Sequence, residues 1–142
     1  MNKAMPTPAA VLAIWTLIVL IWMARTRFAH LARAGLGAKD ATPGMRGCDL
    51  EGRVPPDVMW KSHNYSHLLE QPTLFYAVCL MLALPNSGLI DVALGWAYVV
   101  LRVVHSLWQC TVNTIPTRIR LFALSTLTLL ALAVRAFYLS VI

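Results

Sequence analysis

The sequence of 142 residues is unusually apolar, since 58% of its residues are hydrophobic and only 13% are charged. Its mean hydropathy is +0.65. The length allows one domain, and this composition excludes an ordinary soluble protein. The net charge of +6 comes with no basic stripe interleaved with aromatic residues and no known nucleic-acid-binding motif, so we expect no nucleic-acid partner.

Four apolar segments predict membrane-spanning helices, because about 20 mainly apolar residues cross the hydrocarbon core of a bilayer. The second segment is interrupted by Glu70 and Pro72. We expect spans at about residues 8–25, 58–84, 89–112 and 118–141, with a polar loop at about 26–57. The first segment is longer than the apolar part of a signal peptide, so we expect an uncleaved span. The prediction is an all-α, integral-membrane four-helix bundle that forms one domain over residues 1–142.

Basic residues gather on two of the three connections. Seven of the twelve Lys and Arg lie between the first and second spans, and Arg118 and Arg120 flank the turn before the fourth. The turn between the second and third spans, residues 85–91, contains no Lys or Arg. The positive-inside rule then predicts that loop 26–57 and turn 113–118 are cytoplasmic and that both termini lie on the opposite side. The positive charge predicts contact with membrane lipid headgroups.

The second predicted helix carries a polar stripe near its expected cytoplasmic end. The spacing i, i+4, i+7 aligns His63, His67 and Glu70 on one helix face, and Asn64 lies beside them. Ionisable groups inside membrane spans are costly and usually face a bundle interior or a hydrated cavity.

A second stripe lies on the third predicted helix, where Arg102, His105, Ser106 and Gln109 again share one face. Both stripes point toward the same end of the bundle. They predict one polar, cytoplasm-facing pocket, with Arg118 at the head of the fourth helix as a further cation.

Simpler interpretations remain open for several of these residues. Lys61 and His63 would serve as headgroup contacts, and Glu70 and Arg102 would form an ion pair between helices. Arg135 would extend to the interface alone. The five tryptophans would be interfacial anchors or lipid-facing residues, and Cys48, Cys79 and Cys110 would be buried small apolar residues.

Two motifs resemble those of the MAPEG family, the membrane-associated proteins in eicosanoid and glutathione metabolism. One is "HNYSHLLEQPTLFY", a polar approach to a glutamate followed by proline and an aromatic-aliphatic run. The other is "RVVHSLWQCTVNTIPTRIR", an Arg-x-x-His followed by an arginine at the head of the fourth helix. The resemblance covers nearly the whole chain and is closest to a divergent, bacterial-type member, which favours a bacterial inner membrane.

The resemblance implies a homotrimer that binds glutathione as co-substrate between subunits. It assigns the glutathione amino group to Glu70, the third-helix polar pair to Arg102 and His105, and thiolate stabilisation to Arg118. The chemistry is suitable, because glutathione has two carboxylates and one ammonium, and a nearby cation favours the nucleophilic thiolate. A lipophilic small-molecule electrophile would approach from the bilayer, for conjugation or for peroxide reduction.

Three positions depart from the family pattern. His67 stands where the family has asparagine, with Asn64 one turn earlier; His63 stands where an arginine is expected, and Gln109 replaces a tyrosine. The residues that we expect to bind glutathione are therefore Glu70, Arg102, His105, Asn64, His67, His63 and Gln109.

The departures leave two further hypotheses beside the transferase or peroxidase. One is a non-catalytic trimeric binding or scaffold protein. The other, less favoured, is a metal site built from His63, His67, Glu70 and His105, since two histidines at i, i+4 have the spacing of helical zinc ligands.

Overall fold

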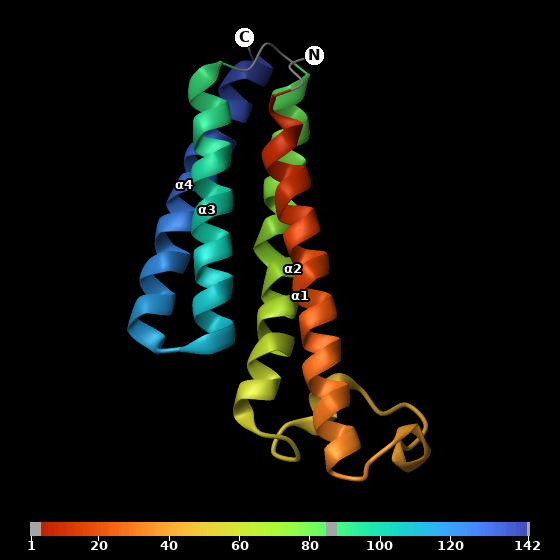
Figure 1. Ribbon diagram of the computed structural model, residues 1–142. Coiled ribbons are helices and arrows are strands. Elements are labelled where there is room, and N and C mark those ends of the chain that lie inside the picture. The colour runs from red at the N-terminus through yellow and green to blue at the C-terminus, as the bar shows by residue number, and fades with distance from the viewer. Residues whose placement is uncertain (1–3, 85–87, 142) are drawn as a thin grey trace.

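Four long helices form the chain, which is described here from a computed structural model for residues 4–84 and 88–141 (Figure 1). The helices are α1 (Pro6–Arg33), α2 (Pro56–Ala83), α3 (Leu89–Thr111) and α4 (Ile115–Val141). Two short 3₁₀ helices, η1 (Ala38–Asp40) and η2 (Gly47–Leu50), lie in the loop between α1 and α2. The predicted all-α four-helix architecture is confirmed, and within the described residues no strand interrupts it. Residues 85–87 of the predicted turn at 85–91 lie outside the described residues.

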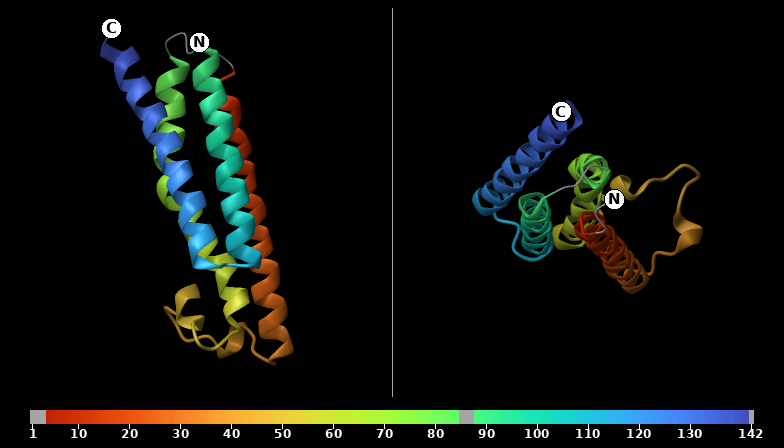
Figure 2. Two further views of the ribbon diagram at one scale, coloured as in Figure 1. Left: turned by 90° about the vertical axis from the view of Figure 1, so that its left-hand side faces the viewer. Right: turned by 90° about the horizontal axis from the view of Figure 1, so that it is seen from above.

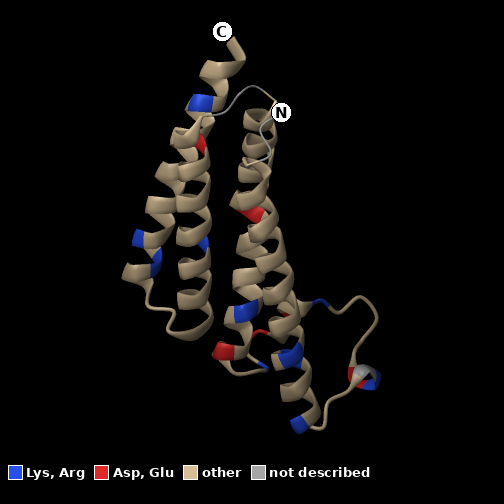
Figure 3. Ribbon diagram, turned by 45° about the horizontal axis from the view of Figure 1, so that its top comes forward, with Lys and Arg blue, Asp and Glu red and all other residues tan. Residues whose placement is uncertain are grey.

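The helices run alternately up and down, so both termini lie at one end of the bundle. The α1–α2 loop and the α3–α4 turn lie at the other end, and α1 and α2 extend beyond that turn (Figures 1 and 2). α1 packs along α2, α3 packs along α4, and contacts of α3 with α1 and α2 join the two pairs. Most Lys and Arg residues gather at the loop end, as Figure 3 shows.

Prolines and capping side chains set the helix ends. Pro6 and Pro56 each occupy the first helical position, where a missing N–H costs nothing. α3 begins with the N–H of Gly88 donating to the Asp91 carboxylate at 2.9 Å. Asn113, in the left-handed region at φ 55°, turns the chain from α3 into α4.

The loop uses the same device at η2, where the N–H of Arg46 donates to Asp49 Oδ2 at 2.7 Å. This backbone hydrogen bond, together with the Arg46 charge, holds the pKa of the Asp49 carboxyl below its usual value. Cys48 is exposed beside it, so the prediction that all three cysteines are buried is wrong for this one.

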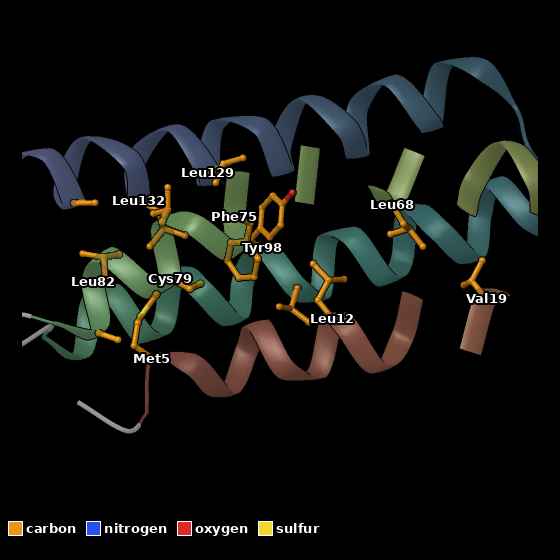
Figure 4. Close-up of a cluster of buried hydrophobic side chains, with 14 residues drawn as sticks. Met5, Leu12, Val19, Leu68, Phe75, Cys79, Leu82, Tyr98, Leu129 and Leu132 are labelled. Carbon is orange, nitrogen blue, oxygen red and sulfur yellow. The ribbon is translucent and has the colours of Figure 1, made fainter. Parts of the chain in front are cut away.

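The hydrophobic core lies between all four helices (Figure 4). Its centre is the stacked ring pair of Phe75 and Tyr98, whose centroids are 4.3 Å apart, with Leu12 and Leu132 packed nearby. Many large apolar side chains face outward on every helix, as expected for contact with lipid. By length and composition α1, α3 and α4 suffice to cross a membrane. α2 falls short because its first half carries the polar stripe.

An ion pair joins α3 to α4 near the termini. The Arg135 guanidinium donates to both carboxylate oxygens of Asp91, a residue with no exposed surface. The interpretation that Arg135 extends alone to the interface is therefore wrong. The sequence did not signal the pair, because its members lie 44 residues apart.

Candidate functional site

Parts of the polar stripes of α2 and α3 meet inside the bundle. Arg102, with no exposed surface, donates from Nη2 to the main-chain oxygen of His67 at 2.9 Å. Arg102 lies thirteen residues into α3 from Leu89, which corresponds to about 20 Å along the helix axis. The guanidinium is thus deep within the helical bundle and not at its edge.

Three rings from three helices pack together beside Arg102. His67 and His105 meet edge to face with centroids 5.3 Å apart, and Phe122 of α4 stacks on His67 at 5.1 Å. The Arg102 guanidinium carbon lies 5.9 Å from the centre of the Phe122 ring. A cation over an aromatic face gains favourable electrostatic energy, so Phe122 stabilises the buried charge of Arg102.

Arg118 joins the group from the first turn of α4, one turn before Phe122. It is half-buried, and its Nη1 donates to Asn113 Oδ1 at 2.7 Å. Phe122, which stacks on His67, follows Arg118 at i+4, so Arg118 lies on the same face of α4 as this ring. A guanidinium has five N–H donors, so the bond to Asn113 orients Arg118 and leaves donors for a ligand.

Asn64 lies at a junction of three helices. Its amide donates to Ser106 Oγ at 2.6 Å and to Cys110 Sγ at 3.2 Å, and Trp15 Nε1 donates to the same Ser106 oxygen at 3.0 Å. Asn64 is 1% exposed. The Trp15 side chain therefore faces the bundle and bonds to α3. This corrects the interpretation of Trp15 as an interfacial or lipid-facing residue.

Glu70 points away from this interior. Its side chain is 70% exposed, and Oε2 lies 3.2 Å from Nδ1 of His67. The alternative of a Glu70–Arg102 ion pair is wrong for the described chain, since Arg102 bonds the His67 carbonyl instead. Glu70 and Arg102 thus face different surroundings: the carboxylate faces outward and the guanidinium inward.

His63 and Lys61, which lie nearest the loop, each have a partner of their own. Nε2 of His63 lies 2.5 Å from Oε1 of Glu51 in the loop, outside the buried cluster. Lys61 is only 8% exposed; it donates to the main-chain oxygen of Asp57 at 2.6 Å and lies over the Trp22 ring. Lys61 therefore does not serve as an exposed headgroup contact, as one interpretation held.

Several buried polar atoms have no hydrogen-bond partner within the described part of the chain. They are Nε and Nη1 of Arg102, both ring nitrogens of His105, Oδ1 of Asn64 and Oε1 of Gln109. Gln109 is 5% exposed and His105 is 1% exposed. Because buried polar groups are nearly always hydrogen-bonded in native proteins, this region is suited to take up a polar ligand or ordered water.

The metal hypothesis fails on geometry. Across residues 4–84 and 88–141, no three His, Cys, Asp or Glu side chains come close enough together to hold an ion. His63 bonds the loop carboxylate, and Glu70 faces away from His105.

Sequence reasoning missed Phe122 and the pairing of Trp15 with Ser106. Phe122 is four residues after Arg118, so helical spacing was a usable signal for a shared face. The Trp15–Ser106 bond spans 91 residues and had no local signal. The structure brings Arg102, His105 and His67 together, with Arg118 nearby on α4. It separates His63 from them, and Glu70 meets the cluster only at His67, with its side chain turned outward.

Comparison with known proteins agrees with this architecture. The model of the MAPEG family matches residues 5–138, which is nearly the whole chain. No curated protein and no solved structure gives a significant match. The family consists of membrane proteins of glutathione and eicosanoid metabolism, and its four-helix membrane bundle is the fold described above. The chain belongs to the MAPEG family.

Proposed function

We propose that the protein is a homotrimeric, glutathione-dependent transferase or peroxidase that acts on lipophilic electrophiles in the bilayer. The observation that carries the proposal is the buried cluster of Arg102 and His105, in which Nε and Nη1 of Arg102 and both ring nitrogens of His105 have no protein partner in the described chain. Cationic and neutral donors at that depth suit a ligand with two carboxylates.

The outer face of α2 supports the trimer. His63, Ser66, Glu70, Thr73, Ala77 and Leu80 follow the spacing 3, 4, 3, 4, 3 and are all exposed in the single chain. This is the heptad spacing of left-handed helix packing, and small residues at such a seam let helices approach closely. Glu70 lies one turn of α2 further from the loop than His67, whose main-chain oxygen accepts the Arg102 bond. A carboxylate that faces lipid at this depth is costly. A neighbouring subunit and the ammonium of glutathione would remove that cost.

In this proposal Arg118 favours the thiolate of bound glutathione, because a nearby guanidinium stabilises the negative sulfur. The thiol proton leaves to solvent on binding. In conjugation the sulfur then forms a bond to the electrophilic carbon while the leaving group departs with its electron pair. Glu70 accepts the ammonium, and Arg102, His105, Asn64, His67, His63 and Gln109 form the remaining polar wall. Loop 26–57 and turn 113–118 face the cytoplasm, in a bacterial inner membrane.

The test uses Arg118→Ala with Arg120→Ala as the matched control, since Arg120 is exposed and two residues away. Conjugation of a chromogenic lipophilic electrophile should fall about 10²-fold or more in Arg118→Ala, the usual effect of removing one transition-state donor. The ultraviolet absorbance of the bound glutathione thiolate should fall with it. Equal rates in the two variants would refute the role of Arg118.

A second candidate, a trimeric glutathione-binding or scaffold protein without catalysis, is favoured by one observation. Arg102, His105 and Gln109 are all at most 5% exposed, so they lie inside the chain and not on an open wall. This candidate predicts saturable glutathione binding with no turnover of any electrophile. Absence of binding in the purified trimer would refute both candidates.

A further inference from the structure

An apolar groove lies between the C-terminal part of α1 and the loop that follows it, away from the polar cluster. Its volume is about 530 Å³, and its apolar lining includes Phe28, Leu31, Leu36, Met45 and Leu50. A second hollow shares most of this lining and adjoins the first, and the two together are here called the loop groove. Phe28 is 68% exposed. Exposed apolar surface beside a groove is typical of a site for an apolar ligand or for a membrane.

Arginine side chains line the loop groove. Arg27 and Arg46 both line it, and the Arg46 side chain is 78% exposed. Arg27 Nη2 donates to Ser62 at 2.7 Å, while its Nε has no partner among the described residues. Gly47 allows this arrangement, because a Cβ there would lie 2.6 Å from Arg27 Nη1. The guanidinium is therefore held in place, with one buried N–H unpaired among the described residues.

The groove lies next to the bilayer. The apolar run of α1 ends at Ala24, and the groove lining begins at Arg27, one turn later. Seven Lys and Arg but only four Asp and Glu lie in residues 25–61. A segment with this excess of positive charge at the edge of the hydrocarbon attracts anionic lipid headgroups.

We propose that the loop groove binds one anionic phospholipid of the adjoining leaflet. Its phosphate lies between Arg27 and Arg46, and one acyl chain lies among the apolar residues of the groove. Guanidinium groups match phosphate oxygens with bidentate hydrogen bonds, and the groove supplies the apolar contact that a soluble anion would not need. The leaflet beside α1 is the source of the ligand. This site is separate from the glutathione site and does not depend on it.

The test measures lipid affinity by native mass spectrometry of the full chain in detergent, titrated with phosphatidylglycerol or phosphatidylcholine. One phosphatidylglycerol per chain should bind saturably and about tenfold more tightly than phosphatidylcholine, since charge-assisted hydrogen bonds decide the difference. Arg46→Gln should weaken phosphatidylglycerol binding about tenfold. Arg33→Gln is the control, because it removes the same charge from the end of α1 without lining the groove.

Ala41→Trp supplies an independent arm, since it fills the groove without changing charge. It should abolish the saturable site while the melting temperature stays unchanged, as Ala41 is exposed. Equal retention of the two lipids, equal effects of Arg33→Gln and Arg46→Gln, or no effect of Ala41→Trp would each overturn the proposal. Displacement of phosphatidylglycerol by an equal concentration of oleate would overturn the phospholipid assignment in favour of a fatty acid.

Discussion

Arg102 of α3 donates to the main-chain oxygen of His67 on α2, and this hydrogen bond connects the two polar stripes at 2.9 Å. Because the acceptor is a backbone atom, the bond does not depend on which side chain occupies position 67. The His67 ring is instead held by Phe122 and His105. The departure from the family's asparagine at this position therefore leaves the Arg102 anchor intact.

Arg102→Met should separate ligand binding from folding. Replacing a buried charge by a well-packed apolar side chain is often neutral or stabilising, so we expect an unchanged or raised melting temperature. Loss of the guanidinium should at the same time abolish the thermal shift that we expect glutathione to produce in the wild type.

Gln71→Leu is the control for this experiment, since Gln71 bonds Thr126 and Tyr98 one turn deeper and is not assigned to glutathione. It should retain the glutathione shift. A full shift in Arg102→Met would exclude Arg102 from the binding site.

The Ser106 junction makes a prediction about stability. Ser106 accepts bonds from Asn64 and Trp15 on two other helices, so Ser106→Ala leaves buried donors unpaired and should cost about 1–3 kcal/mol. Ser125→Ala is the matched control, because Ser125 is equally buried but donates only to Phe122 of its own helix. Unfolding in a denaturing detergent should show the larger loss for Ser106→Ala. Equal losses would mean that the junction contributes no stability.

The sequence predicted the helices well because each signal was local. Apolar runs long enough to cross a bilayer, Pro56 at a helix start and the polar stripes at helical spacing were all visible in a single segment. The predicted and observed helix ends differ most at α1, which continues to Arg33, and at α4, which begins at Ile115 before Arg118. A helix continues past its apolar run wherever the backbone N–H and C=O groups can still hydrogen-bond to one another.

Pairings between helices were not predictable in the same way. The stripes indicated that Glu70 and Arg102 share one pocket, but a few tens of degrees of helix rotation decide whether a side chain faces inward or outward. α2 turns Asn64 into the bundle and Glu70 out of it. That rotation is set by packing against α1 and α3 and leaves no mark in a single sequence.

Ala77→Trp should disrupt the proposed trimer. Ala77 lies in the exposed heptad seam of α2, where close helix approach needs a small side chain. Leu127→Trp on the exposed face of α4 is the control, since it replaces one large apolar residue by another. Cross-linking or light scattering in mild detergent should show monomers for Ala77→Trp and trimers for Leu127→Trp. A trimeric Ala77→Trp would exclude this seam from the interface.

The Asp91–Arg135 pair predicts non-additive stability. Asp91 has no exposed surface and also caps α3 through Gly88, so Arg135→Met leaves a buried carboxylate without its cation and should lower the melting temperature. Asp91→Asn combined with Arg135→Met should be less destabilised than Arg135→Met alone, because asparagine keeps the cap without the buried charge. Thermal unfolding of the two variants and the wild type tests this order. If the double variant is the less stable, the carboxylate does not depend on Arg135, and the cap at Gly88 is the main role of Asp91.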